Sequence, residues 1–338
     1  MKLSIIVIGK NESRHIGKCL SAALTAAKKC GDYEIIYADS ASTDDTVEKA
    51  SRFPVTIVKL KPEWQITSSA GRYIGYMQTR GDYLLFIDGD TLIYKQWPET
   101  AIRFLEAHPD AGGVAGILHE IFLDKNGFFV SLNKNRYHQR PKTEIVPTFG
   151  GTAMYRREAM ETAGSFNPWV LATPELETAL RIRKQGYLLY RIYEPMAITY
   201  APERESLKEV LRRANTNLYA MGNTFRYCLK AGTGLRYLKE RMMFIIRFAA
   251  ALLVLAAAVM FCLLSGRHEL LIIPAGAVLV TLILYTVRRG SLRRVLLSFV
   301  KRSVILYRTI TSFIWLRVRI NEAYPLNVTV IREHKGSG

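Results

Sequence analysis

The chain has 338 residues, which is enough for about two domains with a full core. It carries 47 Lys and Arg against 29 Asp and Glu, a net charge of +18, which is typical of proteins that bind nucleic acid or an anionic membrane. No basic groove, zinc spacing or aromatic RNA-binding motif accompanies the charge, so we predict no nucleic-acid partner. The four cysteines form no close pair, which argues against a disulfide framework and is typical of a cytosol-facing protein.

Apolar runs alternate with helix-like stretches from the start of the chain. The opening run Leu3–Ile8 is too short for a secretory signal and is read instead as a buried strand. The predicted strands cover residues 3–8, 33–39, 55–60 and 81–88, and the predicted helices cover 16–29, 43–52 and 68–79. This alternation predicts an α/β fold, a mostly parallel Rossmann-like sheet with helices on both faces.

Polar clusters follow three of the predicted strands, at residues 9–13, 39–45 and 88–90. Ligands of parallel α/β sheets bind beyond the carboxyl ends of the strands, so we expect the site there. The strongest local signal is Asp88-Gly89-Asp90, where two carboxylates leave the end of an apolar strand. Carboxylates suit a hard divalent cation that also binds substrate phosphates. A cation of this kind would neutralise a nucleotide-diphosphate leaving group.

The C-terminal part of the chain is apolar and basic. Residues 1–200 hold 25 basic and 22 acidic side chains, whereas residues 201–320 hold 20 and 5. Phe248–Gly266 and Leu270–Val287 are free of charged residues for 19 and 18 positions, close to the length that spans a bilayer. Arginines flank the pair on both outer sides, so the positive-inside rule predicts a transmembrane hairpin with both chain ends in the cytoplasm.

Leu292–Leu316 mixes apolar residues with Arg294, Lys301 and Arg308, which recur every seven positions and so share roughly one helix face. We predict a basic amphipathic helix in the membrane interface, with a third spanning helix as the alternative. The predicted organisation is a catalytic domain, a basic juxtamembrane linker, two transmembrane helices, and a cytoplasmic amphipathic helix with its tail. These cover residues 1–225, 226–242, 243–288 and 289–338.

Five segments resemble, in order, the inverting glycosyltransferases of family 2, which have the nucleotide-binding GT-A fold. The matching segments are LSIIVIGKNESRHIGKCL, YADSASTDDTVEKA, SSAGRYIGYMQTRGDYLLFIDGD, FGGTAMYRREAMETAGSFNP and PELETALRIRKQGY. Together they cover residues 3 to about 222. The stretch ERESLKEVLRRANTNLYAMG resembles the post-catalytic helix that leads such enzymes to the membrane. The Gln-x-x-Arg-Trp motif of processive members is missing, which favours transfer of one sugar per acceptor.

The resemblance assigns the donor-binding residues. Asp39 would bind the base or ribose of the nucleotide, and Asn11 and Glu12 would line the nucleobase pocket. Arg72 would approach the donor diphosphate. The donor would be a UDP- or GDP-sugar.

The same resemblance assigns the metal and the sugar side of the site. Asp90 would ligate Mn²⁺ or Mg²⁺ directly, with Asp88 beside the ribose and the metal. Gly150 and Gly151 would let the backbone approach the sugar or acceptor, because glycine has no Cβ. Plain turns explain the glycines equally simply.

The expected catalytic base is the main departure from the family pattern. Members commonly show Glu-Asp, followed two residues later by another acid, where this chain has Pro174-Glu175-Leu176-Glu177. Glu175 falls at the position of the aspartate base, and Glu177 is the reserve candidate. The alternative is that both residues complement a helix N-terminus.

The resemblance and the hydrophobic hairpin together predict a metal-dependent, inverting glycosyltransferase of the inner (plasma) membrane. Its acceptor would be a hydroxyl of a lipid-linked, polyprenyl-diphosphate saccharide, because a soluble acceptor needs no membrane anchor. One alternative is a polyprenyl-phosphate glycosyltransferase, and another is a catalytically inactive membrane scaffold.

Overall fold

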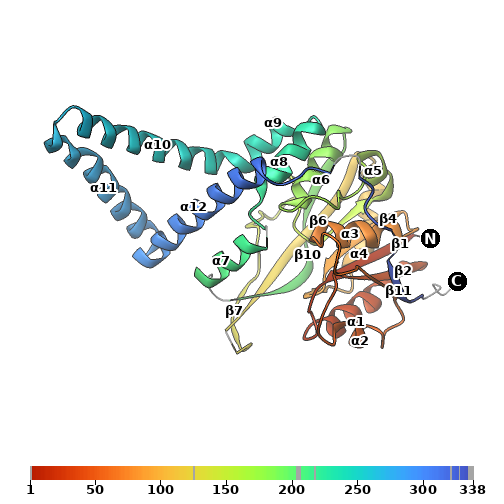
Figure 1. The fold of residues 1–338 in the computed structure, drawn as a ribbon. Coiled ribbons are helices and arrows are strands. Elements are labelled where there is room, and N and C mark those ends of the chain that lie inside the picture. The colour runs from red at the N-terminus through yellow and green to blue at the C-terminus, as the bar shows by residue number, and fades with distance from the viewer. Residues whose placement is uncertain are drawn as a thin grey trace. The chain divides into compact units, whose positions relative to one another are not determined.

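The computed structural model describes residues 2–124, 126–202, 207–216, 218–319, 322–326 and 328–333. The chain divides into two compact units: Met1–Arg204 together with Val318–Gly338, and Glu205–Arg317. The first unit is an α/β sheet domain and the second is entirely helical where it is described (Figure 1). The boundary therefore lies about 20 residues before the predicted one at residue 225, and the end of the chain belongs to the first unit.

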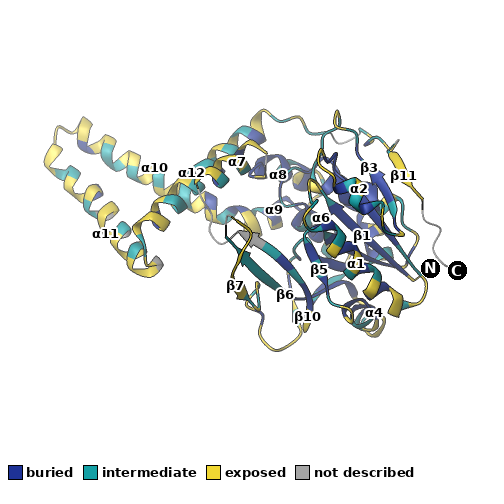
Figure 2. Cartoon of the chain, turned by 90° about the horizontal axis from the view of Figure 1, so that it is seen from below, coloured by how far each residue is buried: buried dark blue, intermediate teal, exposed yellow. Residues whose placement is uncertain are grey.

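The first half of the sheet consists of four parallel strands in the order β3-β2-β1-β4. Their residues are buried almost throughout, which explains why they are continuously apolar rather than alternating (Figure 2). The strands are β1 (Leu3–Gly9), β2 (Tyr33–Asp39), β3 (Thr56–Lys59) and β4 (Tyr83–Asp88). The predicted strands and the predicted fold class are confirmed.

The helices between these strands are α1 (Ile16–Ala27), extended by a 3-10 turn η1 (Lys28–Cys30), α2 (Thr46–Ala50) and α3 (Ser68–Met77). The Thr67 hydroxyl begins α3 by accepting a hydrogen bond from the Ala70 amide at 2.9 Å. The chain moves from β1 outward to β3 and then back to β4, so right-handed crossovers put α3 on the opposite face from α1 and α2. Gly75 allows α3 to lie directly against Ile6 of β1.

The second half of the sheet is mixed. The antiparallel strand β9 (Ala153–Arg156) lies between β4 and the long β6 (Ala111–Leu123). The order then continues through β10 (Leu188–Pro202), parallel to β6, to the antiparallel β5 (Thr91–Ile93). Two short strands, β7 (Phe129–Asn133) and β8 (Glu144–Ile145), pair with β6 and β10, and the helices of this half are α4 (Trp97–Ala107), α5 (Arg157–Ala163) and α6 (Pro174–Lys184).

The end of the chain adds a strand to the first half of the sheet. β11 (Thr329–Arg332) pairs antiparallel with β3. Ahead of it, the buried Tyr324 ring packs against Trp64 and Trp169, and its hydroxyl donates to the Gln65 carbonyl at 2.9 Å. The sequence prediction placed only an amphipathic helix and tail after residue 289, because a four-residue strand carries no periodic signal of its own.

The helical unit holds α7 (Leu207–Asn215), α8 (Met221–Lys230), α9 (Gly234–Tyr237), a π-helical turn η2 (Leu238–Met242), α10 (Met243–Leu264), η3 (His268–Leu271), α11 (Ile272–Arg289) and α12 (Leu292–Ile314). Gly222 of α8 lies directly against the backbone of Thr309 and Phe313, so α8 and α12 pack closely.

Two continuous helical stretches of this unit are long and apolar enough to cross a membrane. They are Gly234–Leu264, with a mean hydropathy of 2.5, and His268–Arg288, with 2.4. Only 6% of the most apolar window of each is buried, whereas a core helix of a soluble protein would be mostly covered. Figure 2 shows most of α10 and α11 in the colours of exposed and intermediate residues. The exposed residues of the two helices include large apolar ones such as Leu253, Leu264 and Ile273.

Candidate active site

The parallel strands bring two predicted site residues to one edge of the sheet. In the β1–β2 register Gly9 lies opposite Asp39, and in the β1–β4 register Ile8 lies opposite Asp88. The turns after β1, β2 and β4 therefore meet at the carboxyl edge. This is where the sequence predicts the ligand site.

Asp39 holds the turns after β1 and β2 together. Its buried carboxylate accepts a hydrogen bond from the Tyr37 hydroxyl at 3.0 Å and another from the Ser42 amide at 2.8 Å. The Ser42 hydroxyl in turn accepts a hydrogen bond from the backbone N–H of Asn11 at 2.9 Å. The side-chain oxygen of Asn11 accepts one from the backbone N–H of Thr43, also at 2.9 Å. Asn11 adopts a left-handed φ of 57°, a conformation that asparagine tolerates better than most residues. Asp39 and Asn11 thus shape the predicted nucleobase pocket, and direct contact with the nucleotide stays a prediction.

Glu12 lies beside the acidic end of β4. The Gly89 backbone packs on its side chain: a Cβ at Gly89 would lie 3.1 Å from Glu12 Cγ. Burial, followed by the negative charges of Asp90 and Asp88, raises the pKa of Glu12 from 4.5 to about 7. Burial, followed by the negative charge of Asp88, also raises the pKa of Asp90. Three carboxyl groups therefore share one region of negative potential.

Arg72 joins Asp88 to Glu175. Its Nη2 atom lies 2.9 Å from Asp88 Oδ1 and its Nη1 atom lies 3.1 Å from Glu175 Oε1. The Arg72 side chain is only 3% exposed, whereas Asp88 and Glu175 are 42% and 22% exposed. A buried guanidinium from α3 thus fixes one carboxylate at the end of β4 and another at the start of α6, and both carboxylates still face solvent.

Gly151 lies in close contact with this pair of charges. A Cβ at this position would overlap Asp88 Oδ2 and would lie 3.0 Å from Arg72 Nη2. A Cβ at Gly150 would overlap the Tyr137 hydroxyl. Neither glycine has a positive φ, so close approach of neighbouring side chains, and not a special turn conformation, explains why both positions are glycine.

Glu177 is engaged elsewhere. Its side chain is 3% exposed and pairs with Arg181, whose Nε lies 2.7 Å from Glu177 Oε1. The Arg181 guanidinium also donates to the carbonyls of Ala163 and Ser165, which ties α6 to the end of α5. Of the two candidate bases, the geometry favours Glu175.

Thr173 presents Glu175 from a strained backbone. It begins α6 with a left-handed φ of 51°, directly before Pro174. A β-branched residue in this region is an outlier, and such strain is concentrated at functional sites. The local sequence gives no sign of this conformation.

Tyr137 and Arg191 also lie at this site, and neither was predicted from the sequence. The Arg191 guanidinium lies over the Tyr137 ring with 4.1 Å to the ring centroid, and Tyr137 reaches Gly150. Burial raises the pKa of the Tyr137 hydroxyl, which keeps it protonated as a possible donor to a substrate oxygen. No local motif marks these residues, because they lie in separate parts of the chain. The Gln139 side chain, close to Tyr137 in the sequence, donates to the Arg191 carbonyl of β10 at 3.0 Å and so connects the two segments.

No group of three or more His, Cys, Asp or Glu side chains is arranged to hold a metal ion among the residues that the structure describes. A metal at Asp88 and Asp90 would take its remaining oxygen ligands from water and the substrate. Magnesium is usually bound in this way, by one or two carboxylates plus substrate phosphates.

Two solved structures share the fold of this chain. The mannosyltransferase PcManGT from Pyrobaculum calidifontis, in complex with GDP-Man and Mn²⁺, superposes with a TM-score of 0.59 and 20% identity, over 93% of this chain and 87% of that chain. The TarS 1–349 structure from S. aureus, in complex with UDP-GlcNAc, has a TM-score of 0.50 and 16% identity, over 67% of this chain and 66% of that chain. The fold is therefore that of the glycosyltransferases.

The sequence comparisons define the family. The family model described as Glycosyl transferase family 2 matches residues 4–164. Glycosyltransferase AglE of Haloferax volcanii is 33% identical over 227 residues, which cover 62% of this chain and 71% of that protein. The chain belongs to glycosyltransferase family 2 and is an enzyme that uses a nucleotide sugar.

Proposed function

We propose that this enzyme transfers one sugar from a nucleotide-diphosphate sugar to a hydroxyl of a lipid-linked saccharide, with inversion at the anomeric carbon and with the help of a divalent cation. The observation that carries the proposal is the Arg72 bridge between Asp88 and Glu175. Two carboxylates thus pair with one buried guanidinium. Asp88 is suited to the diphosphate side of the reaction and Glu175 to the acceptor side.

Glu175 is the proposed base. Its carboxylate accepts the proton of the acceptor hydroxyl as that oxygen attacks the anomeric carbon. The bond between the anomeric carbon and the diphosphate oxygen breaks, and the electron pair leaves with the nucleotide diphosphate. A single displacement inverts the anomeric configuration. Arg72 positions Glu175 for this step through its 3.1 Å ion pair.

Asp90 and Asp88 are the proposed metal ligands. Their hard carboxylate oxygens suit Mg²⁺ or Mn²⁺. Desolvation and then the Asp88 charge raise the pKa of the half-buried Asp90, so a cation there would stabilise its charged form. When bound, the cation would supply charge neutralisation for the leaving diphosphate. Metal complexes of the PcManGT type are consistent with such a site.

The nucleotide of the donor is proposed to be uridine or guanosine diphosphate. The TarS structure holds UDP-GlcNAc and the PcManGT structure holds GDP-Man. In this chain the nucleotide would lie over the turns that Asn11, Glu12 and Asp39 form at the carboxyl edge of the sheet.

The membrane topology is proposed from the return of the chain. The sheet domain that precedes the helical unit in the chain and the strand β11 that follows that unit belong to the same compact unit, since β11 pairs with β3. Two crossings, by α10 and α11, bring the chain back to its starting side, whereas a third crossing by α12 would place β11 across the bilayer from β3. We therefore propose that α12 lies in the interface and that the catalytic unit faces the cytoplasm, as the arginine flanks favour.

A lipid-linked acceptor follows from this topology. Two helices whose apolar surface is exposed keep the catalytic unit at the membrane surface. A water-soluble acceptor gains nothing from that location, whereas the sugar of a polyprenyl-diphosphate saccharide is held there by its lipid.

The test uses the full-length enzyme in lipid nanodiscs with a panel of UDP- and GDP-sugars, scored by released nucleotide with Mn²⁺ or with a chelator. The best donor is then offered with three acceptors: a polyprenyl-diphosphate saccharide, a polyprenyl phosphate, and the same saccharide without lipid. We expect metal-dependent transfer to the first. Equal rates with the lipid-free saccharide would overturn the lipid-linked assignment, and preferential transfer to polyprenyl phosphate would favour the alternative enzyme.

A further inference from the structure

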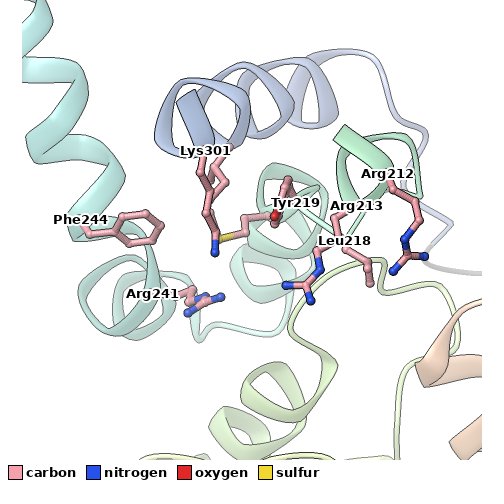
Figure 3. Close-up of a pocket in the computed structure, with 9 residues that line it drawn as sticks. Arg212, Arg213, Leu218, Tyr219, Arg241, Phe244 and Lys301 are labelled. Atoms are coloured by element: carbon pink, nitrogen blue, oxygen red, sulfur yellow. The ribbon is translucent and has the colours of Figure 1, made fainter. Parts of the chain in front are cut away.

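The helical unit contains a basic pocket of about 420 Å³, built entirely from its own residues. Four cationic side chains line it: Arg212, Arg213, Arg241 and Lys301. They come from α7, η2 and α12, which are far apart in the sequence. Figure 3 shows Arg213, Arg241 and Lys301 extending toward one common space.

Among the residues that the structure describes, those that line the pocket include four cations and no acidic side chain. Glu209 of α7 accepts from Arg212 and Arg213, at 2.8 Å in each case. Those hydrogen bonds, first of all that from Arg212, lower the pKa of Glu209 to about 2. Glu209, which lies beside the pocket, is thus held by two of the four lining cations. A site of this kind is suited to a ligand with more than one negative charge, because guanidinium groups match phosphate oxygens in geometry.

The remaining wall of the pocket is apolar. Tyr219, Met221 and Ile305 are buried within it, and Phe244 lies at the first turn of α10. Arg241 precedes the uncharged stretch that begins at Phe248, so it stands where lipid head groups would lie if α10 spans the bilayer. Basic pockets beside membrane helices bind phosphorylated head groups, with the hydrocarbon chain running along the apolar side.

We propose that this pocket binds the diphosphate of the lipid-linked acceptor. The proposal rests on the proposed function for the acceptor's identity, whereas the pocket's preference for a phosphate attached to a hydrocarbon chain rests on its own residues. Inorganic diphosphate and an anionic phospholipid share part of that chemistry and are the other two possible sources of the phosphate.

The test compares the wild-type chain with R241Q/K301Q, which removes two charges from different elements of the pocket. The matched control is R236Q/R293Q, which removes two exposed charges outside the pocket, one near η2 and one on α12. The full-length proteins in neutral-lipid nanodiscs are titrated with a polyprenyl diphosphate, phosphatidylglycerol or inorganic diphosphate, and the melting temperature is measured.

We expect the polyprenyl diphosphate to stabilise the wild type and the control, and R241Q/K301Q to bind it about ten- to thirtyfold more weakly. The KM for the lipid-linked acceptor should rise by a similar factor while the KM for the nucleotide sugar stays unchanged. An unliganded melting temperature near that of the wild type would show that the variant is folded.

Three outcomes would overturn the proposal: equal binding by R241Q/K301Q, equal stabilisation by phosphatidylglycerol, or equal stabilisation by inorganic diphosphate. The last two would identify a general anionic-lipid site and a free-phosphate site. Because binding is measured without turnover, a wild type that binds the polyprenyl diphosphate but transfers no sugar to its saccharide would refute the proposed function and leave the pocket assignment standing.

Discussion

At the scale of single residues, one arginine organises the site. Arg72 is buried on α3, and burying a guanidinium is costly unless anionic partners compensate its charge. Asp88 and Glu175 supply that compensation from two other elements. The positions of both carboxylates are therefore coupled to the stability of the core, which gives the site a fixed geometry before any substrate binds.

The two acidic residues of α6 should separate by their effects. E175Q should lower kcat by about 10²–10⁴-fold, because the amide cannot take a proton from the acceptor. It should also lower the melting temperature, since it removes one of the two anions beside the buried Arg72. E177Q should keep most of kcat while destabilising the fold by about 2–4 kcal/mol, since it weakens a buried ion pair with Arg181. Steady-state kinetics and thermal unfolding of both variants check this. Near-normal turnover by E175Q would refute the assignment of the base.

Glu12 should make the metal-free enzyme less stable as the pH rises. Its pKa in the folded state is about 7 against 4.5 when unfolded, so the folded state binds more protons between these values. The free energy of unfolding therefore decreases as the pH rises from 4.5, and the contribution of Glu12 is fully lost above pH 7. With a chelator present, E12Q should be more stable than the wild type by about 1 kcal/mol at pH 8, the size being reduced by partial solvent exposure. The two proteins should be equal below pH 4.5. A constant difference across this range would contradict the prediction.

At the scale of elements, the site forms where β4 ends beside the segment that leads into β9. These strands pair in antiparallel register from Tyr83–Arg156 to Phe86–Ala153, so the residues just before β9 lie next to the end of β4. Gly151 occupies that place, against Asp88 and Arg72. The Gly-Gly segment and the acidic strand end are therefore one structural feature, although 60 residues separate them in the sequence.

G151A should displace the Asp88 carboxylate, because the new methyl group would occupy the space of its Oδ2 atom. A displacement of about 1 Å at a reacting site can cost about 10²-fold, so we expect kcat/KM for the donor to fall by about one to two orders of magnitude. G17A is the matched control: its Cβ would lie 3.8 Å from Phe53, an ordinary contact, within the helix α1. Normal kinetics for G151A would show that Asp88 can move without consequence.

At the scale of the whole chain, the helical unit is an insertion into the sheet domain. The chain leaves the first unit near residue 204 and returns to it at Val318, where Trp169 donates to the Glu322 carbonyl at 2.9 Å and β11 joins β3. Any membrane crossing inside the insertion must therefore be matched by a return.

Cysteine labelling at single positions tests whether the hairpin crosses the membrane and returns. H268C, in the connector of the hairpin, and R293C, at the start of α12, are treated with a membrane-impermeant maleimide in vesicles of both orientations. We expect the two positions to label from opposite sides, with R293C on the side of the catalytic unit. The wild type measures the background from its own cysteines, three of which are buried. Labelling of both positions from the same side would refute a spanning hairpin.

The sequence alone determined the elements and the class of chemistry. Continuous apolar runs fixed the four parallel strands, the uncharged stretches fixed the hairpin, and Asp88-Gly89-Asp90 marked the acidic strand end, because each of these signals lies within a few neighbouring residues. The tertiary structure alone decided that Arg72 bridges Asp88 and Glu175, that Glu177 pairs with Arg181, that Tyr137 reaches Gly150, and that the tail returns as β11. Those contacts join residues up to about 270 positions apart, and packing of the whole chain, which no local pattern encodes, brings them together.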